Sequence, residues 1–143
     1  MKIAVSACLM GDNVRYDGTN KRNEELICLL EGHEIIRICP EAMVFPIPHL
    51  PIEIKDGSIM DSDGFDHTER LTQACKECLA QIDGCELVIL KSKSPSCGYG
   101  EIYDGSFFET IIKGNGIFAA LCEKNAYNIL TENDLEEIRR LLG

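Results

Sequence analysis

Residues 86–100, ELVILKSKSPSCGYG, join a short apolar run to a loop that carries one cysteine among serines, glycines and a proline. The run at 86–91 has the length of a strand, and its unbroken apolar middle is typical of a strand covered on both faces. The proline and the glycines end it. The chain therefore leaves a buried strand and presents Cys97 on the next loop. Whether Cys97 belongs to a site depends on the residues at the ends of the other strands.

The same alternation of short apolar runs and helical periodicity continues on both sides of this stretch. It predicts further strands over residues 2–7, 33–38 and 127–130. Apolar positions spaced for one face of a helix predict helices over residues 21–32, 67–82, 116–126 and 132–142. We expect Asp66 and Glu69 to form a capping box at the second of these helices, and Thr131 to cap the last.

The segment between residues 39 and 66 interrupts this alternation. Residues 39–51, CPEAMVFPIPHLP, contain four prolines, so neither a helix nor a central strand is expected there. Residues 52–61 predict a hairpin that turns at Asp56-Gly57, and residues 107–112 are expected to be extended. The predicted fold class is α/β: a single open, doubly wound domain of residues 1–143 with a mainly parallel sheet and an inserted hairpin.

Composition limits the partners of the chain. It has 143 residues and a formal net charge of −10. Nucleic acid is not expected as a partner, since phosphates are bound mainly by Lys and Arg. No apolar stretch approaches the roughly 20 residues that span a bilayer, and the start turns polar too early for a signal peptide. The eight cysteines are therefore expected in the cytoplasm, as thiols or metal ligands rather than disulfides.

Three of these cysteines have equivalent places in the predicted fold. Cys8, Cys39 and Cys97 each lie beyond the carboxyl end of a predicted strand, where open α/β sheets bind ligands. We expect the three to meet on one rim. The other five fall in predicted helices or before a strand, and we expect them to be structural: Cys28, Cys75, Cys78, Cys85 and Cys122. The C-x-x-C pair among them lies in the middle of a helix, which favours packing over zinc or redox chemistry.

Three thiolates with an open coordination position suit two kinds of metal centre. One is a catalytic zinc site and the other an iron–sulfur cluster, whose free iron would suit a sulfur atom on a substrate. A non-catalytic metal–sulfur carrier or sensor is a third possibility. Several polar residues near the cysteines are candidates for substrate contacts or proton transfer. They are Arg15, Glu41, His49, Lys91, Ser94 and Ser96.

The order of SACLMG, RYDG, CPE and SPSCG along the chain resembles the DUF523 family, which includes thiouracil desulfidases. The resemblance implies a four-iron, four-sulfur cluster held by Cys8, Cys39 and Cys97. It also implies a small thiolated pyrimidine as substrate, whose C=S becomes C=O with release of sulfide. Such a cluster is expected to be lost or replaced after handling in air.

The resemblance also implies roles for residues around the cluster. Glu41 of CPE would be the acid/base for attack of water, and Ser94 and Ser96 of SPSCG would help to hold the substrate. The chain departs from the family after CPE, where members carry a Gly-Gly pair and a Pro-Arg pair. Val44 and Phe45 replace the glycines and His49 replaces the arginine, which is expected to reshape the pocket.

Overall fold

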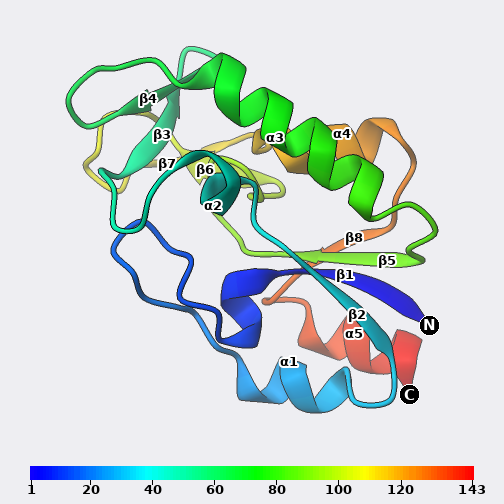
Figure 1. Cartoon of the computed structure of the whole chain (residues 1–143). Coiled ribbons are helices and arrows are strands. Elements are labelled where there is room, and N and C mark those ends of the chain that lie inside the picture. Colours follow the sequence, from blue (N-terminus) through cyan, green and yellow to red (C-terminus); the bar gives the residue numbers. More distant parts are fainter.

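The computed structural model covers residues 1–143 and is built on one parallel sheet (Figure 1). Along the sheet lie β2 (Glu34–Ile38), β1 (Lys2–Ser6), β5 (Leu87–Leu90) and β8 (Ile129–Thr131), in that order. All three neighbouring pairs are parallel. The order of the strands reverses at β1, because the chain passes first to β2 on one side and later to β5 on the other. Such a sheet is open and doubly wound, which confirms the predicted α/β fold class.

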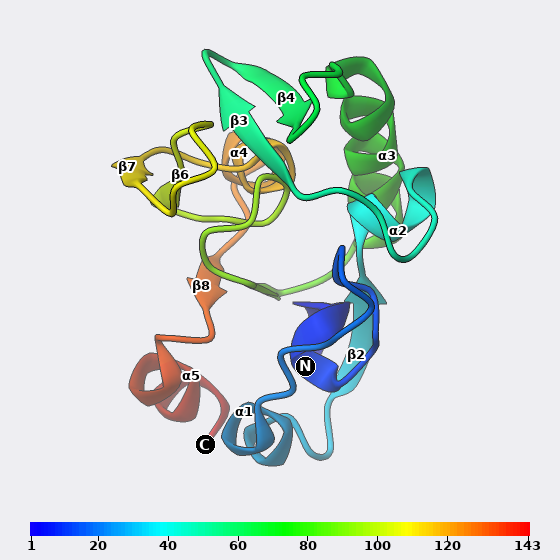
Figure 2. The same cartoon turned by 90° about the vertical axis from the view of Figure 1, so that its left-hand side faces the viewer.

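Four helices cover the two faces of the sheet. Figures 1 and 2 show α3 (Thr68–Gln81) and α4 (Ile117–Lys124) over one face, and α1 (Glu24–Leu29) and α5 (Leu135–Leu142) over the other. None of the helices is both long and apolar enough to cross a membrane.

The central strands alternate between two hydrophobic cores. On β1, Ile3 and Val5 pack in the core beside α1 and α5, whereas Ala4 packs in the core beside α3 and α4. Residues 87–90 of β5 repeat this alternation, and none of them is more than 1% exposed. A strand buried on both faces needs apolar residues at every position, which explains the unbroken run in the sequence.

The helix starts differ in detail from the predictions. Asn23 is the N-cap of α1, so the helix begins at residue 24 rather than 21. Asp66 accepts the backbone N–H of Thr68 at 2.8 Å, in place of the predicted capping box. Thr131 belongs to β8, and the residue before α5 is Asp134, whose carboxylate accepts the N–H of Thr131 at 2.8 Å. The predicted cap at Thr131 was therefore wrong by three residues.

A short helix, α2 (Pro40–Val44), lies where no helix was predicted. Pro40 occupies its first position, where a proline is tolerated because the N–H that it lacks would have no partner within the helix. Phe45 is extended, as a residue before proline prefers, so the helix ends there. The prolines of residues 39–51 thus begin and end a helix instead of preventing one.

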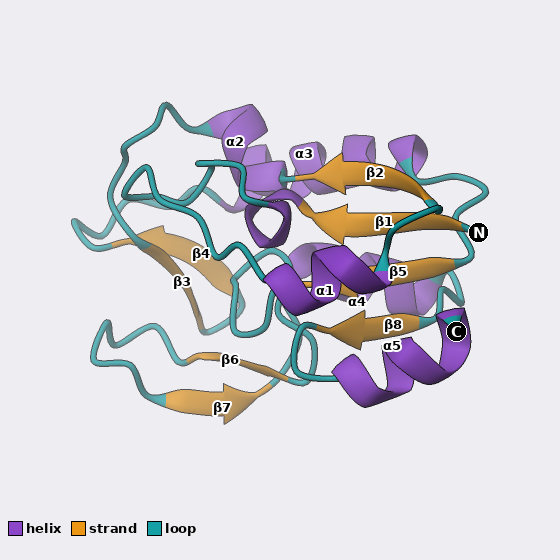
Figure 3. Cartoon of the chain, turned by 90° about the horizontal axis from the view of Figure 1, so that it is seen from below, coloured by secondary structure: helices purple, strands orange, loops and turns teal.

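Two hairpins lie beyond the carboxyl ends of the parallel strands (Figure 3). The first, β3 (Ile52–Lys55) with β4 (Ser58–Asp61), is the predicted hairpin, with Asp56 and Gly57 both at positive φ in its turn. The second pairs β6 (Glu101–Tyr103) with β7 (Ile111–Lys113). It was predicted only in part, because residues 107–110 form a bent connection rather than a strand.

Candidate functional site

Three cysteines from three separate strand ends line one cavity of about 590 Å³. Cys8 lies in a 3-10 turn, η1 (Ala7–Met10), directly after β1. Cys39 directly follows β2 and is the N-cap of α2, and Cys97 lies in the loop after β5. β1 lies between β2 and β5 in the sheet, so their three carboxyl ends meet on one rim. The structure thus brings together the cysteines that the sequence singled out.

Burial keeps the three thiols neutral in the absence of a cation. It raises the pKa of Cys8 to about 11 and that of Cys39 to about 12, and raises the pKa of Cys97 well above its ordinary value. Cys8 raises the pKa of Cys39 further, and Cys39 that of Cys97, because neighbouring thiolates would repel. A metal centre needs thiolates, so a bound cation would supply the charge that this site lacks.

The donor set fits a group larger than a single ion. No three His, Cys, Asp or Glu side chains lie close enough together to hold one metal ion. The three thiols border a shared cavity, and the cations Lys91 and Arg15 lie near enough to Cys8 to offset part of the rise in its pKa that burial causes. Soft sulfur donors spaced around a cavity suit an iron–sulfur cluster.

Glu41 and two serines form a hydrogen-bonded group beside the thiols. The hydroxyl of Ser96 donates to Glu41 Oε2 at 2.9 Å, and that of Ser94 lies 3.3 Å from the same oxygen. The Ser94 hydroxyl also accepts the backbone N–H of Cys97 at 3.0 Å. Burial raises the pKa of Glu41, while the bonds from both serines and the nearby His49 and Arg15 lower it. The result is a partly buried carboxyl group whose orientation is fixed at the cavity wall.

The loop that carries these serines is held against the start of α4. The backbone N–H groups of Ile117 and Phe118 donate to the carbonyls of Pro95 and Ser96, at 3.0 and 2.8 Å. Gly116 makes this approach possible, because a Cβ there would lie 2.6 Å from the Ser96 carbonyl. The sequence around Gly116 therefore fixes the geometry of a loop about 20 residues earlier, since α4 supplies partners for the backbone of that loop.

A partly buried ion pair orients Lys91 at the cavity. Its Nζ lies 3.1 Å from Glu132 Oε2, and Glu132 also accepts the N–H and hydroxyl of Ser92 at 2.8 and 3.0 Å. The register explains this contact: Leu90 of β5 pairs with Thr131 of β8, and Lys91 and Glu132 are the next residues. Sequence reasoning missed Glu132, because an acidic residue before a helix gives no sign of its partner on a neighbouring strand.

His49 does not line the cavity, although it lies near enough to Glu41 to lower the pKa of that carboxyl group. Its ring stacks on that of Phe45 with centroids 4.5 Å apart, and its Nδ1 lies 2.6 Å from the Leu50 carbonyl. Phe45 in turn meets the ring of His67 edge-on at 5.0 Å. Phe45 and His49, two positions that were expected to differ from the family pattern, thus pack on each other. Arg15 does line the cavity, whereas the role of His49 in substrate binding stays a prediction.

The hairpins supply another part of the cavity wall. Their place in the site was not predicted from the sequence. Figure 3 shows both hairpins facing the rim of the sheet. Their cavity-lining residues are Ile52, Glu53, Tyr103, Phe107 and Glu109, and Ser62 directly after β4 also lines the cavity. These residues lie on turns or short strands without a recognisable motif, so no local signal marks them.

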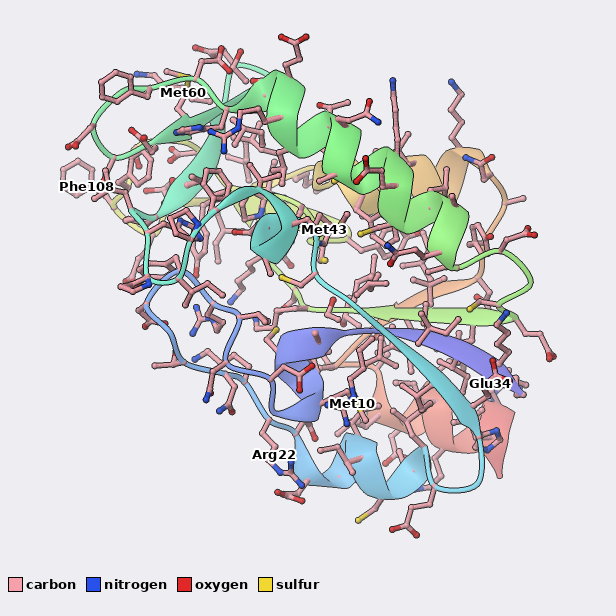
Figure 4. The ribbon with its side chains drawn as sticks, in the orientation of Figure 1. Met10, Arg22, Glu34, Met43, Met60 and Phe108 are labelled. Atoms are coloured by element: carbon pink, nitrogen blue, oxygen red, sulfur yellow. The ribbon has the colours of Figure 1, made fainter.

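The remaining five cysteines do not line the cavity. Cys75, Cys78 and Cys122 are fully buried between α3, α4 and the sheet, and all eight cysteines are free thiols. Cys78 Sγ lies 3.4 Å from the sulfur of Met43, which Figure 4 shows on α2 next to α3. A second depression, of about 700 Å³, lies between α2 and α3, but none of the candidate residues lines it.

A doubly wound sheet with a thiol-lined cavity at its switch point defines the class as an α/β protein with a candidate metal–sulfur centre. The 2-thiouracil desulfurase family matches residues 3–134. The uncharacterized protein YbbK of Bacillus subtilis is 35% identical over 149 residues, covering 95% of this chain and 99% of that protein. The chain belongs to the 2-thiouracil desulfurase family, which confirms the resemblance to DUF523.

A solved structure agrees with this assignment. The [4Fe-4S]-dependent thiouracil desulfidase TudS is 36% identical in sequence and superposes with a TM-score of 0.86. The match covers 99% of this chain and 97% of TudS. The similarity therefore includes the hairpins as well as the parallel sheet.

Proposed function

We propose that this protein is a [4Fe-4S]-dependent desulfidase that acts on a small thiolated base such as 2-thiouracil. Water would replace sulfur at the thiocarbonyl carbon, so that C=S and H₂O become C=O and H₂S with no net transfer of electrons. Family membership and the likeness to TudS support the reaction class. We further propose that the 143 residues act as one domain in the cytoplasm, where thiols stay reduced.

Cys8, Cys39 and Cys97 would hold the cluster. When bound by three cysteines, a four-iron cluster leaves one iron without a protein ligand, and this iron can take a soft sulfur atom as a Lewis acid. The observation that carries the proposal is the convergence of these three thiols, from three strand ends, on the cavity that Glu41 also lines.

Glu41 would move the proton in this reaction. Its carboxylate takes a proton from the attacking water and returns it to the departing sulfur, which is the usual work of a general acid–base. Ser96 and Ser94 orient Oε2 of the carboxylate, so its other oxygen, Oε1, is free to meet water. Because Glu41 is partly buried and its pKa is raised, proton transfer costs less than for a carboxylate in water.

Two cations would stabilise charge on the substrate. Lys91 is oriented by Glu132, and Arg15 lines the same cavity. Negative charge develops on the substrate as water attacks, and cations in a partly buried cavity stabilise it more than they would in water.

Anaerobic purification followed by a desulfuration assay tests the proposal. We expect a brown protein with about four irons per chain, broad absorption near roughly 400 nm, and release of sulfide and uracil from 2-thiouracil. A colourless protein with one zinc ion would support a zinc hydrolase instead. Full iron content without turnover of any thiolated base would support a carrier or sensor.

A further inference from the structure

Glu53 is a buried carboxylate on the hairpin wall of the cavity, outside the group around Glu41. It lies on β3 and is 9% exposed, while its neighbour Ile52 is 6% exposed. Charged side chains are rarely buried to this extent unless they are paired, and Glu53 forms no salt bridge. Its burial therefore needs a reason beyond packing.

Only one oxygen of Glu53 is satisfied by the protein. Oε1 accepts the backbone N–H of Gly105 at 3.0 Å and that of Phe107 at 3.1 Å. Oε2 has no hydrogen-bond partner in the chain and is not fully enclosed by protein atoms, and Glu53 is one of the residues that line the cavity. A carboxylate oxygen can only accept hydrogen bonds, so Oε2 can take a donor from water or from a ligand.

The loop around Glu53 is built to hold the carboxylate still. Gly105 has φ of +93°, and a Cβ there would lie 2.5 Å from the Cβ of Lys55, so only glycine allows the loop to come this close to β3. Phe107 also has positive φ, at +63°, which points its N–H at Oε1. Two backbone donors thus fix Oε1, which holds the carboxylate in place and leaves Oε2 without a protein donor before any ligand arrives.

We propose that Glu53 Oε2 accepts a hydrogen bond from a ring N–H of the thiolated base, and so selects substrates that carry this donor. The inference rests on the proposed function. The base would span the cavity, with its sulfur toward the thiols at the rim of the sheet and an N–H toward the hairpin wall. Thioamides and thioureas with a ring N–H fit this wall, whereas a carbonyl or N-alkyl group facing Glu53 would be repelled or left unpaired.

Glu53→Gln separates the proposed role of Glu53 in substrate binding from its role in anchoring the loop of Gly105 and Phe107. The amide oxygen can still accept from Gly105 and Phe107, so the loop keeps its anchor, while the amide NH₂ replaces Oε2 and offers a donor where an acceptor stood. Glu101→Gln is the matched control, since it makes the same chemical change at an exposed position on β6 that does not line the cavity.

The test compares 2-thiouracil with its 1,3-dimethyl derivative, using anaerobic protein with full iron content. We expect the wild type and Glu101→Gln to prefer 2-thiouracil strongly. In Glu53→Gln, KM for 2-thiouracil should rise on the order of 10- to 100-fold, the scale of a hydrogen bond to a charged group, with kcat changed only a few-fold. The preference over the dimethyl compound should largely disappear.

Several results would overturn the inference. Unchanged KM and unchanged preference in a folded, iron-loaded Glu53→Gln would leave Glu53 as a loop anchor only. If that variant does not fold, the wild type decides: equal kcat/KM for 2-thiouracil and the dimethyl compound contradicts the proposal. If the iron-loaded wild type turns over neither compound, the proposed function fails. Calorimetric titration with 2-thiouracil then tests the role of Glu53 in binding. Equal Kd values for the wild type and Glu53→Gln would contradict the inference.

Discussion

The hydroxyl of Ser96 donates a 2.9 Å hydrogen bond to Glu41, although 55 residues separate the two in sequence. The sheet explains the contact. Glu41 follows β2 and Ser96 follows β5, and both strands pair with β1, so their carboxyl ends flank Cys8. The candidate acid/base and the candidate cluster ligands are therefore held by the same three strands.

Glu41→Gln should separate proton transfer from metal binding. The substitution keeps the size and polarity of the side chain but removes its ability to take a proton. We expect full iron content and a loss of roughly 100-fold or more in the single-turnover rate on 2-thiouracil. Iron should be quantified in the same samples. Full activity would remove Glu41 from the mechanism, and loss of iron would give it a structural role.

Ser96→Ala should act through Glu41. We expect the rate to fall on the order of 10-fold, because a hydrogen bond to a charged group is lost while the bond from Ser94 remains. The double variant with Glu41→Gln should be no slower than Glu41→Gln alone, since the serine then has no carboxylate to orient. A further loss of roughly 10-fold in the double variant would mean that Ser96 contacts the substrate independently.

We propose Cys8, Cys39 and Cys97 as the cluster ligands and expect Cys75 and Cys78 to be core residues, and iron content tests this division. Alanine at Cys8, Cys39 or Cys97 should remove most of the iron. Alanine at Cys75 and Cys78 together should lower stability but leave the iron per folded chain unchanged, because both are buried in the core beside α3. Cys75 makes this a demanding test: burial raises its pKa, and Glu41 and Cys39 lie near enough to raise it further. Loss of iron in that double variant would contradict the assignment.

Asp61 should make stability depend on pH in acid. The hydrogen bond from His67, at 2.8 Å, and those from the N–H groups of Phe65 and Asp63 lower the pKa of Asp61 below its ordinary 3.8. The charged form is favoured by folding, so this stabilisation is complete above pH 3.8 and is lost as the pH falls through the lowered pKa.

Urea unfolding of the metal-free protein measures this effect. Asp61→Asn should be less stable than the wild type at pH ~7, and the difference should shrink below pH 3.8. Asp63→Asn, at an exposed position in the same turn, should show no such change. A difference between Asp61→Asn and the wild type that stays constant with pH would exclude the carboxylate as its cause.

The parallel sheet and the meeting of the three cysteines at its rim could be predicted from the sequence. Strands buried on both faces leave unbroken apolar runs, such as residues 87–90, and crossover connections make such strands parallel. Parallel strands carry their loops to one rim, so a cysteine after each strand predicts a shared site without knowledge of any contact. The helix α2 was not predicted, because four prolines in a short segment argue against a helix. Pro40, however, occupies the first turn, where proline is tolerated.

Only the tertiary structure decided the rest of the site. Glu132 meets Lys91 because β8 lies beside β5, and Glu53 faces the cavity because a second hairpin folds against β3 and supplies two N–H groups to one of its oxygens. His49 does not line the cavity, and its ring stacks on that of Phe45. The sequence alone determined the sheet and the three thiols at its rim, because periodicity and strand ends are local. The partners of charged side chains are set by which strands become neighbours, and that is a long-range property of the folded chain.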